Sequence, residues 1–427
     1  MVAAVASTDR AQHLIDTCAV LWPQPAAAAL TGAGLGLPAV GRASWPSATS
    51  QATDSEFILL FGTRRPRLLI PTVPAAASAA VRGYSAVGSR SARLGAGVLS
   101  LALRTRVGQA AFRSRLSVRV PPGADTIESF LADALGSAVM VSLYVGPARA
   151  NRKPILQLLS PDGRPVGFAK VGTNPLTRAL VLAESQALAR LGGAGLAGIT
   201  VPEVLFYGVW RGMNILVQTA LPVWQRRRSV AGARLAAAMI AVAQVGGLRR
   251  EPLANSPYWR QLMGRLAAAD QSAARDRLLS ALSTLSAHAG DAIVLLGSWH
   301  GDWTPWNMAS TRSGLLVWDW ERFSDGVPLG FDALHYRLQE DLVSSHRDPG
   351  ADAASCIENA ADVLAPFEIT GSQARLICIL YLADLATRYL CDRQAEAGAP
   401  LGAVSGWLIP AITGQVNRLC LARADRA

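Results

Sequence analysis

The residues of this chain that could do chemistry stand close together in the sequence. Asp302 is followed by Asn307 five residues later, and Asp319 comes twelve residues after that. Phosphoryl transfer uses one Asp to accept the proton of a hydroxyl group, and an Asn and a second Asp to hold Mg²⁺ on the nucleotide phosphates. The types and spacing of the three residues therefore predict a phosphotransferase.

The neighbouring residues narrow this prediction. His300-Gly301-Asp302, taken with Val317-Trp318-Asp319-Trp320-Glu321, resembles the aminoglycoside phosphotransferase and choline kinase-like family of small-molecule kinases. Protein kinases usually carry Arg at the position of Gly301 and Phe-Gly after the metal-binding Asp. The resemblance covers residues from about 139 to 335 well and the C-terminal helices loosely, and it leaves residues 1–124 outside.

The resemblance implies a role for each of five residues. Asp302 is expected to be the catalytic base that orients the acceptor hydroxyl, with Asn307 and Asp319 as the Mg²⁺ ligands. Lys170 is expected to steady the α- and β-phosphates, and Glu184 to be its ion-pair partner.

Other residues near the motifs are expected to support the loop. His300 is expected to hold it in place, and Asp332 resembles a structural Asp of the family. Five Trp fall in the same segment, where large aromatic side chains favour packing over stacking on an acceptor: Trp299, Trp303, Trp306, Trp318 and Trp320.

The elements that must position these residues have the order of a kinase small lobe. Two predicted strands flank a glycine-containing loop, and a hairpin turn leads to a third strand that carries Lys170. Asn174 and Pro175 mark the start of a helix. The predicted ranges are 139–145, 155–160 and 165–171 for these strands, about 175–191 for the helix, 203–207 and 214–218 for two further strands, and 219–222 for a hinge.

Glu184 lies on the apolar stripe of that helix, one turn from both Leu180 and Leu188. Leaving a buried carboxylate without its partner costs about 3–5 kcal/mol, so Lys170 on the preceding strand is the expected partner. The alternative is that Glu184 lies at the edge of the stripe. Of 41 basic residues only Lys153 and Lys170 are lysine, and both fall in the predicted nucleotide-binding lobe.

The loop over residues 146–154 differs from a glycine-rich phosphate loop, because it has one Gly and three cationic side chains. Arg149, Arg152 and Lys153 are therefore candidates to contact phosphates directly. The alternative is a solvated hairpin tip.

Residues 1–124 form a separate compositional unit. They contain 13 Arg against 4 Asp and Glu, which is +9 of the net charge of +11. Such a region could bind phosphate, anionic lipid or a polyanion, or it could reflect a general preference for Arg. Nucleic acid is not the expected partner, because no motif accompanies the charge.

Cysteine usage and hydropathy indicate the cellular compartment of the protein. Five scattered Cys without a CxxC pair suit a reducing cytoplasm. The longest apolar run, 235–248, is too short to span a membrane, and the N-terminus has no basic lead before an apolar stretch, so a cytoplasmic protein without a transmembrane segment is expected.

We therefore expect an α+β protein with a two-lobed protein kinase-like fold. Residues 125–222 form a small antiparallel-sheet lobe with one helix, which binds the nucleotide, and 223–427 form a large, mainly helical lobe with the catalytic loop and metal site. Residues 1–124 precede them as a basic accessory region of unknown fold, and Pro121-Pro122-Gly123 marks the boundary.

The expected reaction moves the γ-phosphoryl group of ATP or GTP, with Mg²⁺, to a hydroxyl of a small molecule. Sugars, amino alcohols and nucleosides remain open as acceptors, as does the oligomeric state. Two alternatives stand beside this reading. One is a catalytically inactive kinase-like module that binds nucleotide or a polyanion, and the other is a protein kinase.

Overall fold

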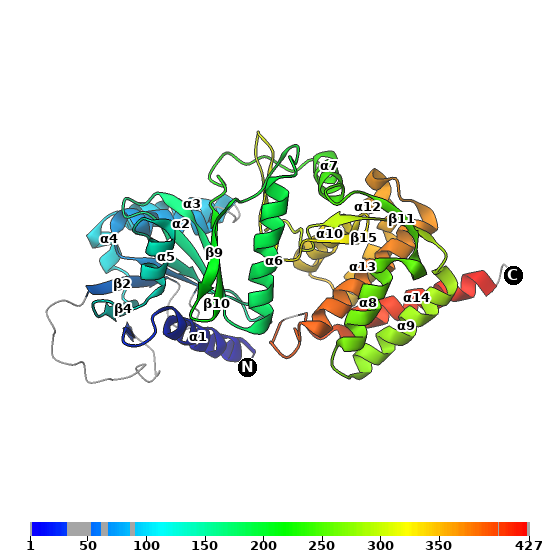
Figure 1. Cartoon of the computed structure of the whole chain (residues 1–427), viewed down its shortest axis with the longest axis horizontal. Helices are drawn as coiled ribbons and strands as arrows, with labels where there is room; N and C mark the ends of the chain where they lie inside the picture. Colours follow the sequence, from blue (N-terminus) through cyan, green and yellow to red (C-terminus); the bar gives the residue numbers. More distant parts are fainter. Residues whose placement is uncertain (1, 32–52, 61–66, 86–89, 400, 425–427) are drawn as a thin grey trace. The chain divides into compact units, whose positions relative to one another are not determined.

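The computed structural model describes residues 2–31, 53–60, 67–85, 90–399 and 401–424. The chain divides into two compact units (Figure 1). The first comprises Met1–Ala148, Arg152–Leu182 and Pro202–Gln225, and the second comprises Arg149–Asn151, Ala183–Val201 and Arg226–Ala427. The first unit is built on an antiparallel sheet and the second is mainly helical, so the predicted α+β class is confirmed.

The first unit contains one nine-stranded sheet in which every neighbouring pair is antiparallel. The strand order is β1-β4-β2-β3-β5-β6-β7-β10-β9. The strands are β1 (Ala27–Thr31), β2 (Thr53–Leu60), β3 (Leu68–Pro71), β4 (Arg115–Val120), β5 (Met140–Tyr144), β6 (Ile155–Leu159), β7 (Pro165–Gly172), β9 (Val204–Trp210) and β10 (Met213–Thr219).

Strands from the N-terminal region belong to this same sheet. β3 pairs with β5 through Leu68 opposite Tyr144 and Leu69 opposite Leu143, and the Ser142 hydroxyl donates to the Leu69 carbonyl oxygen at 2.9 Å. The predicted boundary at residue 124 therefore falls inside a continuous sheet, between β4 and α5 (Ile127–Leu135). A separate role for the first 124 residues stays a prediction.

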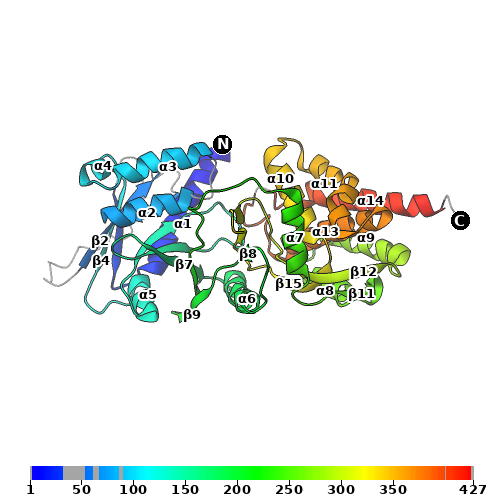
Figure 2. The ribbon, with the colours of Figure 1, turned by 90° about the horizontal axis from the view of Figure 1, so that it is seen from above.

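Alternating side chains of β2 build a core on each face of the sheet, as the two-residue period of a strand requires. Phe57 and Leu59 pack with residues of α1 (Val2–Leu21) and α5. Ile58 and Leu60 pack with residues of α2 (Pro74–Ser85) and α3 (Arg90–Ala102). Figure 2 shows α2 and α3 on the side of the sheet opposite to α5.

The elements predicted for residues 139–219 are present close to the predicted ranges. α6 (Pro175–Gly192) begins at the predicted proline, and the Asn174 side chain accepts from the Thr177 N–H at 2.9 Å, which satisfies one N–H of the first turn. This helix runs from the first unit into the second, which begins again at Ala183.

The second unit is built around α13 (Gly371–Cys391), which is buried along most of its length. It packs against α8 (Pro257–Ala268), α9 (Ala273–Ala289), α10 (Phe331–Ser344), α11 (Pro349–Glu358), α12 (Ala360–Leu364) and α14 (Leu408–Ala424), while α7 (Gly232–Ala243) packs on β12. These helices confirm the predicted helical lobe.

Two small sheets carry the loops with the conspicuous motifs. One has the order β11 (Arg249–Pro252), β12 (Ile293–Trp299), β15 (Ser324–Pro328), and the other β13 (Met308–Ser310), β14 (Leu315–Val317), β8 (Ile199–Thr200). The loop with Asp302 joins β12 to β13, and the loop with Asp319 joins β14 to β15.

Among the described residues, no single helix has the length and apolar character to cross a membrane. One bent pair, Ala360–Phe367 with Gly371–Cys391, meets the length and composition criteria with an angle of 102° between its parts.

Candidate active site

The loop after β12 turns sharply at Gly301, and this turn sets the position of Asp302. Gly301 has φ +83°, and a Cβ at this position would lie 2.4 Å from the carbonyl oxygen of Arg322. Because of the left-handed backbone and this close approach, any residue other than glycine would be strained at this position. The local fold therefore requires glycine immediately before Asp302.

His300 joins the two loops. Its Nδ1 accepts from the Asp302 N–H at 3.1 Å, so its proton is on Nε2, which donates to the Trp318 carbonyl oxygen at 3.0 Å. Burial lowers the pKa of His300 to about 4, which keeps the ring neutral at neutral pH. His300 thus has the geometry expected of a residue that holds the loop.

Two helices of the second unit fix the backbone at this turn. Asp332, in the first turn of α10, accepts from the N–H groups of His300 and Gly301 at 2.8 and 3.2 Å. Burial raises the pKa of Asp332 to about 7, although both hydrogen bonds oppose the shift. Arg388, on α13, donates to the Gly301 carbonyl oxygen at 2.6 Å.

Asp302 is held through both carboxylate oxygens. Its Oδ1 accepts from His335 Nε2 and its Oδ2 from Asn307 Nδ2, each at 3.0 Å. Asn307 Nδ2 also donates to the Asp302 carbonyl oxygen at 2.9 Å, which fixes the two predicted residues together. The Asp302 side chain is still 35% exposed, so a ligand can reach it.

The surroundings keep Asp302 ionised. Burial by itself raises the pKa of this carboxyl, but the hydrogen bond from His335 and the positive charge of Arg388 oppose it. The pKa of Asp302 is therefore below its ordinary value, even though the charge of Asp319 raises it. An ionised carboxylate that a ligand can reach is able to accept a proton.

The sequence analysis missed two residues, His335 and Tyr381, whose hydrogen bonds support the Asp302 carboxylate. His335 Nδ1 lies 3.0 Å from the hydroxyl of Tyr381, and both side chains are buried. Burial raises the pKa of Tyr381 well above its ordinary value, so the phenol keeps its proton and donates to Nδ1. Burial also lowers the pKa of His335, which favours a neutral ring that donates from Nε2 to Asp302.

A sequence signal for His335 did exist. It follows Asp332 by three residues on one helix, a spacing that places both on the same face. Tyr381 had no such signal, because it lies 46 residues from His335 along the chain.

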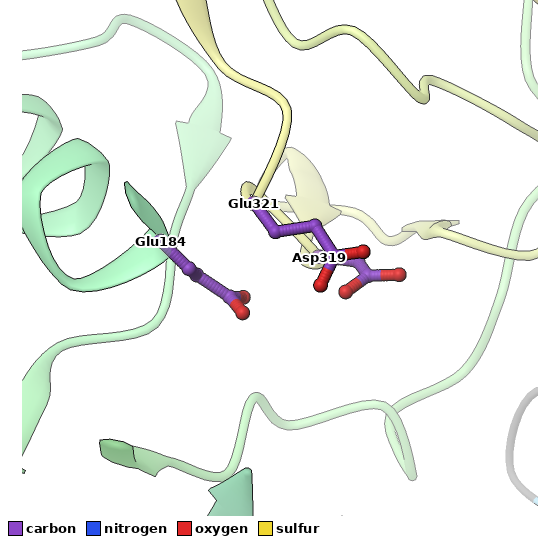
Figure 3. Close-up of side chains that lie close together, drawn as sticks. All are labelled: Glu184, Asp319 and Glu321. Atoms are coloured by element: carbon purple, nitrogen blue, oxygen red, sulfur yellow. The ribbon is translucent and has the colours of Figure 1, made fainter. Parts of the chain in front are cut away.

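Three carboxylates gather beside the second loop. Ligand oxygens of Glu184, Asp319 and Glu321 all lie within 4.8 Å of one another (Figure 3). Glu184 accepts from the Trp320 N–H at 3.3 Å, and Glu321 accepts from Asn151 Nδ2 at 3.1 Å. Carboxylates this close repel one another, so a cation between them would lower the energy of the cluster.

Asp319 has an unusual backbone for this position. Its φ is +72°, a left-handed conformation that costs a residue other than glycine about 1–2 kcal/mol. Such strain persists where the surroundings determine the conformation, and it is frequent at functional sites. Glu321 belongs to the motif recognised in the sequence, but a metal-ligand role was predicted only for Asp319 and Asn307.

The predicted phosphate-binding residues differ in how deeply they are buried. Lys170 is buried on β7, opposite Ile155 and Leu216 of the neighbouring strands. Lys153 is also buried, at 8% exposure, which does not fit a solvated hairpin tip. Arg149 is exposed and Arg152 half-buried. Lys170 belongs to the first unit and Glu184 to the second, and their pairing stays a prediction.

The aromatic side chains near the loops are mainly packing residues. Trp303 and Trp320 are fully buried, and the Trp320 ring lies 4.4 Å from that of His300. Trp299 is buried and donates to the Ser324 hydroxyl at 2.8 Å. These three therefore support the loops, as the sequence indicated.

Comparison with known proteins gives structural matches only. No family model matches the sequence, and no curated protein matches it. An aminoglycoside phosphotransferase, APH(4)-Ia, in complex with ADP and hygromycin B, is 15% identical and covers 67% of this chain and 97% of its own, with a TM-score of 0.43.

Two further solved structures are similar. Choline kinase LicA from Streptococcus pneumoniae is 14% identical over 67% of this chain and 98% of its own, with a TM-score of 0.44. Amicoumacin kinase hAmiN, in complex with AMP-PNP, Ca²⁺ and Ami, is 13% identical over 65% and 88%, with a TM-score of 0.40.

Proposed function

We propose that this protein is a phosphotransferase that moves the γ-phosphoryl group of ATP or GTP to a hydroxyl of a small molecule. The observation that carries the proposal is the setting of Asp302. It is a reachable, ionised carboxylate held through both oxygens, and its partner Asn307 lies on the same loop. This is what a base needs in order to orient a hydroxyl group for in-line attack.

The donor set near Asp319 fits Mg²⁺. Carboxylate and amide oxygens are the ligands that this hard cation prefers, and Asp319, Asn307, Glu184 and Glu321 supply only such oxygens, since Asn307 turns its nitrogen to Asp302. We propose Asn307 and Asp319 as the metal ligands, with Glu184 and Glu321 as further candidates. A bound Mg²⁺ would neutralise charge on the phosphates.

The residues of the chain do the remaining work by positioning. His335 and Tyr381 fix the orientation of the Asp302 carboxylate, and Asp332, Arg388 and His300 fix the backbone that carries it. Placing a hydroxyl correctly at such a base removes much of the entropic part of the barrier. Asp302 then accepts the proton of the hydroxyl as the oxygen attacks phosphorus.

The cationic residues of the first unit are proposed to bind the nucleotide. Lys170 is proposed to meet the α- and β-phosphates, and Lys153, with Arg152, to add positive charge to the same ligand. Arg149 is a further candidate for contact with phosphate. A Lys170→Met variant should raise the Kd for ATP at least about tenfold.

The first test is a calorimetric titration of ATP and Mg²⁺ into the wild type and into Asp319→Ala. We expect binding that depends on the metal and that the substitution abolishes. Asp276→Ala is the matched control, because Asp276 is an exposed carboxylate in the same unit, and it should bind as the wild type does. An acceptor screen over sugars, amino alcohols and nucleosides follows, and the same titration with GTP decides between nucleotides.

The competing function is a kinase-like module that binds nucleotide or a polyanion without turnover. The observation that favours it is the loop between β5 and β6, which has a single glycine to offer backbone donors to phosphates. If wild-type protein binds Mg²⁺ and ATP but transfers phosphate to no acceptor, this second function replaces the first. Rapid phosphorylation of a generic protein mixture would instead indicate a protein kinase.

A further inference from the structure

A row of large apolar side chains is exposed on α3 and α4 (Arg106–Ala110) of the first unit. Leu94, Val98 and Leu101 are 75%, 74% and 67% exposed, and Val107 on α4 is 86% exposed. The first three are four and three residues apart, so they form one stripe along the helix. We call these four residues the α3–α4 patch. Single exposed apolar residues are ordinary, whereas a stripe of them marks an interaction site.

The opposite face of α3 is firmly packed, so the stripe cannot turn inward. Ala96 and Leu103 belong to the core that α3 shares with α2 and the sheet. The Ser100 hydroxyl is buried 2.7 Å from that of Ser78 on α2, and Arg82 donates to Ser78 at 3.1 Å. The helix therefore has a fixed inner face, and its apolar outer face is a constant feature of the surface.

All charged residues in the stretch of sequence that contains the patch are arginines. Between Glu56 and Asp125 the sequence has 11 Arg and no Asp, Glu or Lys. Arg104, Arg106 and Arg113 are exposed next to the patch in the sequence. An apolar stripe with arginines beside it is the composition of a helix that lies in a bilayer interface, with its apolar side chains among acyl chains and its cations at anionic headgroups.

We infer that the α3–α4 patch docks on the surface of an anionic lipid bilayer. A nucleic acid would use the arginines but would gain nothing from four exposed aliphatic side chains. A second copy of the same patch would place the arginines of two chains against one another, which is unfavourable. The inference does not depend on the proposed reaction, because no residue of the patch belongs to the candidate active site.

The test is sedimentation of the full-length protein with vesicles. One preparation is phosphatidylcholine alone, and the other is phosphatidylcholine mixed with phosphatidylglycerol. We expect binding to the mixed vesicles that weakens as salt is added, and little binding to the neutral ones. A triple variant, Leu94→Ser, Val98→Ser and Leu101→Ser, should lower the partition coefficient at least about tenfold, since three apolar side chains no longer enter the interface.

Two further variants sharpen the test. Arg104→Gln should lower the partition coefficient about fivefold, because each arginine near an anionic surface contributes about a factor of this size. Val343→Ser is the matched control, since Val343 is 62% exposed on α10 of the other unit, and it should bind as the wild type does.

Several outcomes would overturn the inference. One is no binding of the wild type to the mixed vesicles, and another is equal binding by the triple variant. If sedimentation velocity shows a dimer that the triple variant dissociates, the occupant is a second copy of the chain and the lipid inference is wrong. All three are independent of phosphotransferase activity, so a failure here leaves the proposed reaction untouched.

Discussion

The candidate active site of the second unit and the α3–α4 patch of the first differ in how their side chains meet their surroundings. Around Asp302 the polar groups are inside and paired, since both carboxylate oxygens and both ring nitrogens of His335 have partners. On α3 the apolar groups are outside, at exposures of 67–75%. Buried polar groups cost free energy unless they are hydrogen-bonded, and exposed apolar stripes gain from a partner.

The comparison shows two ways in which a sequence departs from the simple burial pattern. Around Asp302, hydrogen bonds within the chain compensate for the burial of polar groups. Removing one of these hydrogen-bond partners should therefore lower both stability and activity. On the α3–α4 patch, the exposed apolar side chains can be covered only by a partner from outside the chain. Removing one of them should therefore leave the free energy of unfolding unchanged. The experiments below separate these two situations.

The largest effect is expected for Asp302→Asn. An amide can keep the hydrogen bond from His335 Nε2 but cannot accept the proton of a hydroxyl group. The rate of phosphotransfer to an identified acceptor should fall at least about a thousandfold. The free energy of unfolding should also fall by about 1 kcal/mol, because the new NH2 group cannot accept the hydrogen bond from Asn307 Nδ2. Steady-state kinetics measure the fall, and Asp276→Asn should have wild-type activity. Full activity in Asp302→Asn would remove the base from the mechanism.

A large stability effect is expected for Gly301→Ala. The substitution combines the left-handed φ of +83° with a Cβ 2.4 Å from the Arg322 carbonyl oxygen. The free energy of unfolding should fall by about 4 kcal/mol, measured by urea denaturation. Gly326→Ala is the control, since Gly326 has φ +72° and its Cβ would meet nothing within 4 Å. Its cost should be about 1–2 kcal/mol. Equal costs would show that the contact with Arg322 contributes nothing.

His300 should make the protein sensitive to acid. Its pKa is about 4 in the folded chain and 6.5 when unperturbed. The unfolded state therefore binds the proton first, and stability is lost as the pH falls from about 6.5 towards 4. At pH 5 this amounts to about 2 kcal/mol relative to pH 7.5.

Urea denaturation of wild type and His300→Gln at several pH values checks this. The variant is less stable throughout, but its stability should fall by about 2 kcal/mol less between pH 7.5 and 5. Asp332 acts in the opposite sense, because its raised pKa favours unfolding as the pH rises from about 4 to 7. The same slope in both proteins would contradict a buried neutral His300.

Tyr381→Phe is expected to have a smaller effect that is specific to the site. Without the phenol donating to Nδ1, His335 accepts a second proton more easily, so its pKa should rise. A positive His335 makes Asp302 a weaker base, and the acid limb of the pH–rate profile should move to higher pH. The free energy of unfolding should fall by about 1 kcal/mol.

Tyr258→Phe is the matched control for this prediction. Tyr258 is equally buried, and its hydroxyl donates to the Leu380 carbonyl oxygen at 3.1 Å, outside the candidate site. It should lose a similar amount of stability and keep the wild-type pH–rate profile. Identical profiles for both variants would reduce Tyr381 to a packing residue.

The smallest effect is expected on α3. Leu101→Ala should change the free energy of unfolding by less than about 0.5 kcal/mol, because the side chain is 67% exposed. Leu103→Ala, two residues further along the chain, removes a fully buried side chain and should cost about 2–5 kcal/mol. Thermal denaturation of the pair measures the contrast. A similar cost for both would mean that the stripe is already packed within the protein.

The sequence predicted the parts of the site that are local in the chain. Asp302, Asn307 and Asp319 lie within eighteen residues, and their spacing is set by the loop and the hairpin that carry them. Glu184 was singled out because a carboxylate on an apolar stripe needs a partner. Its closeness to Asp319 and Glu321 was not predicted, because that contact joins α6 to a loop far along the chain.

The remaining parts depend on contacts between distant segments. His335 reaches Asp302 across 33 residues, and Tyr381 reaches His335 across 46, and no periodicity reports such pairs. The same reason explains why the sheet pairing of the N-terminal region was not predicted. Its fold was left unknown, because the pairing of β3 with β5 follows from the register of two strands separated by four helices and β4.

The pairing of β3 with β5 has a consequence for any shortened form of the protein. Removing residues 1–124 would convert β5 from an interior strand into the edge of the sheet, with a row of unpaired N–H and C=O groups. Such an edge is a template for association between chains, so a truncated protein should aggregate even if the loop with Asp302 were intact. Within the described part of the chain, β3 thus covers the edge that β5 would otherwise present.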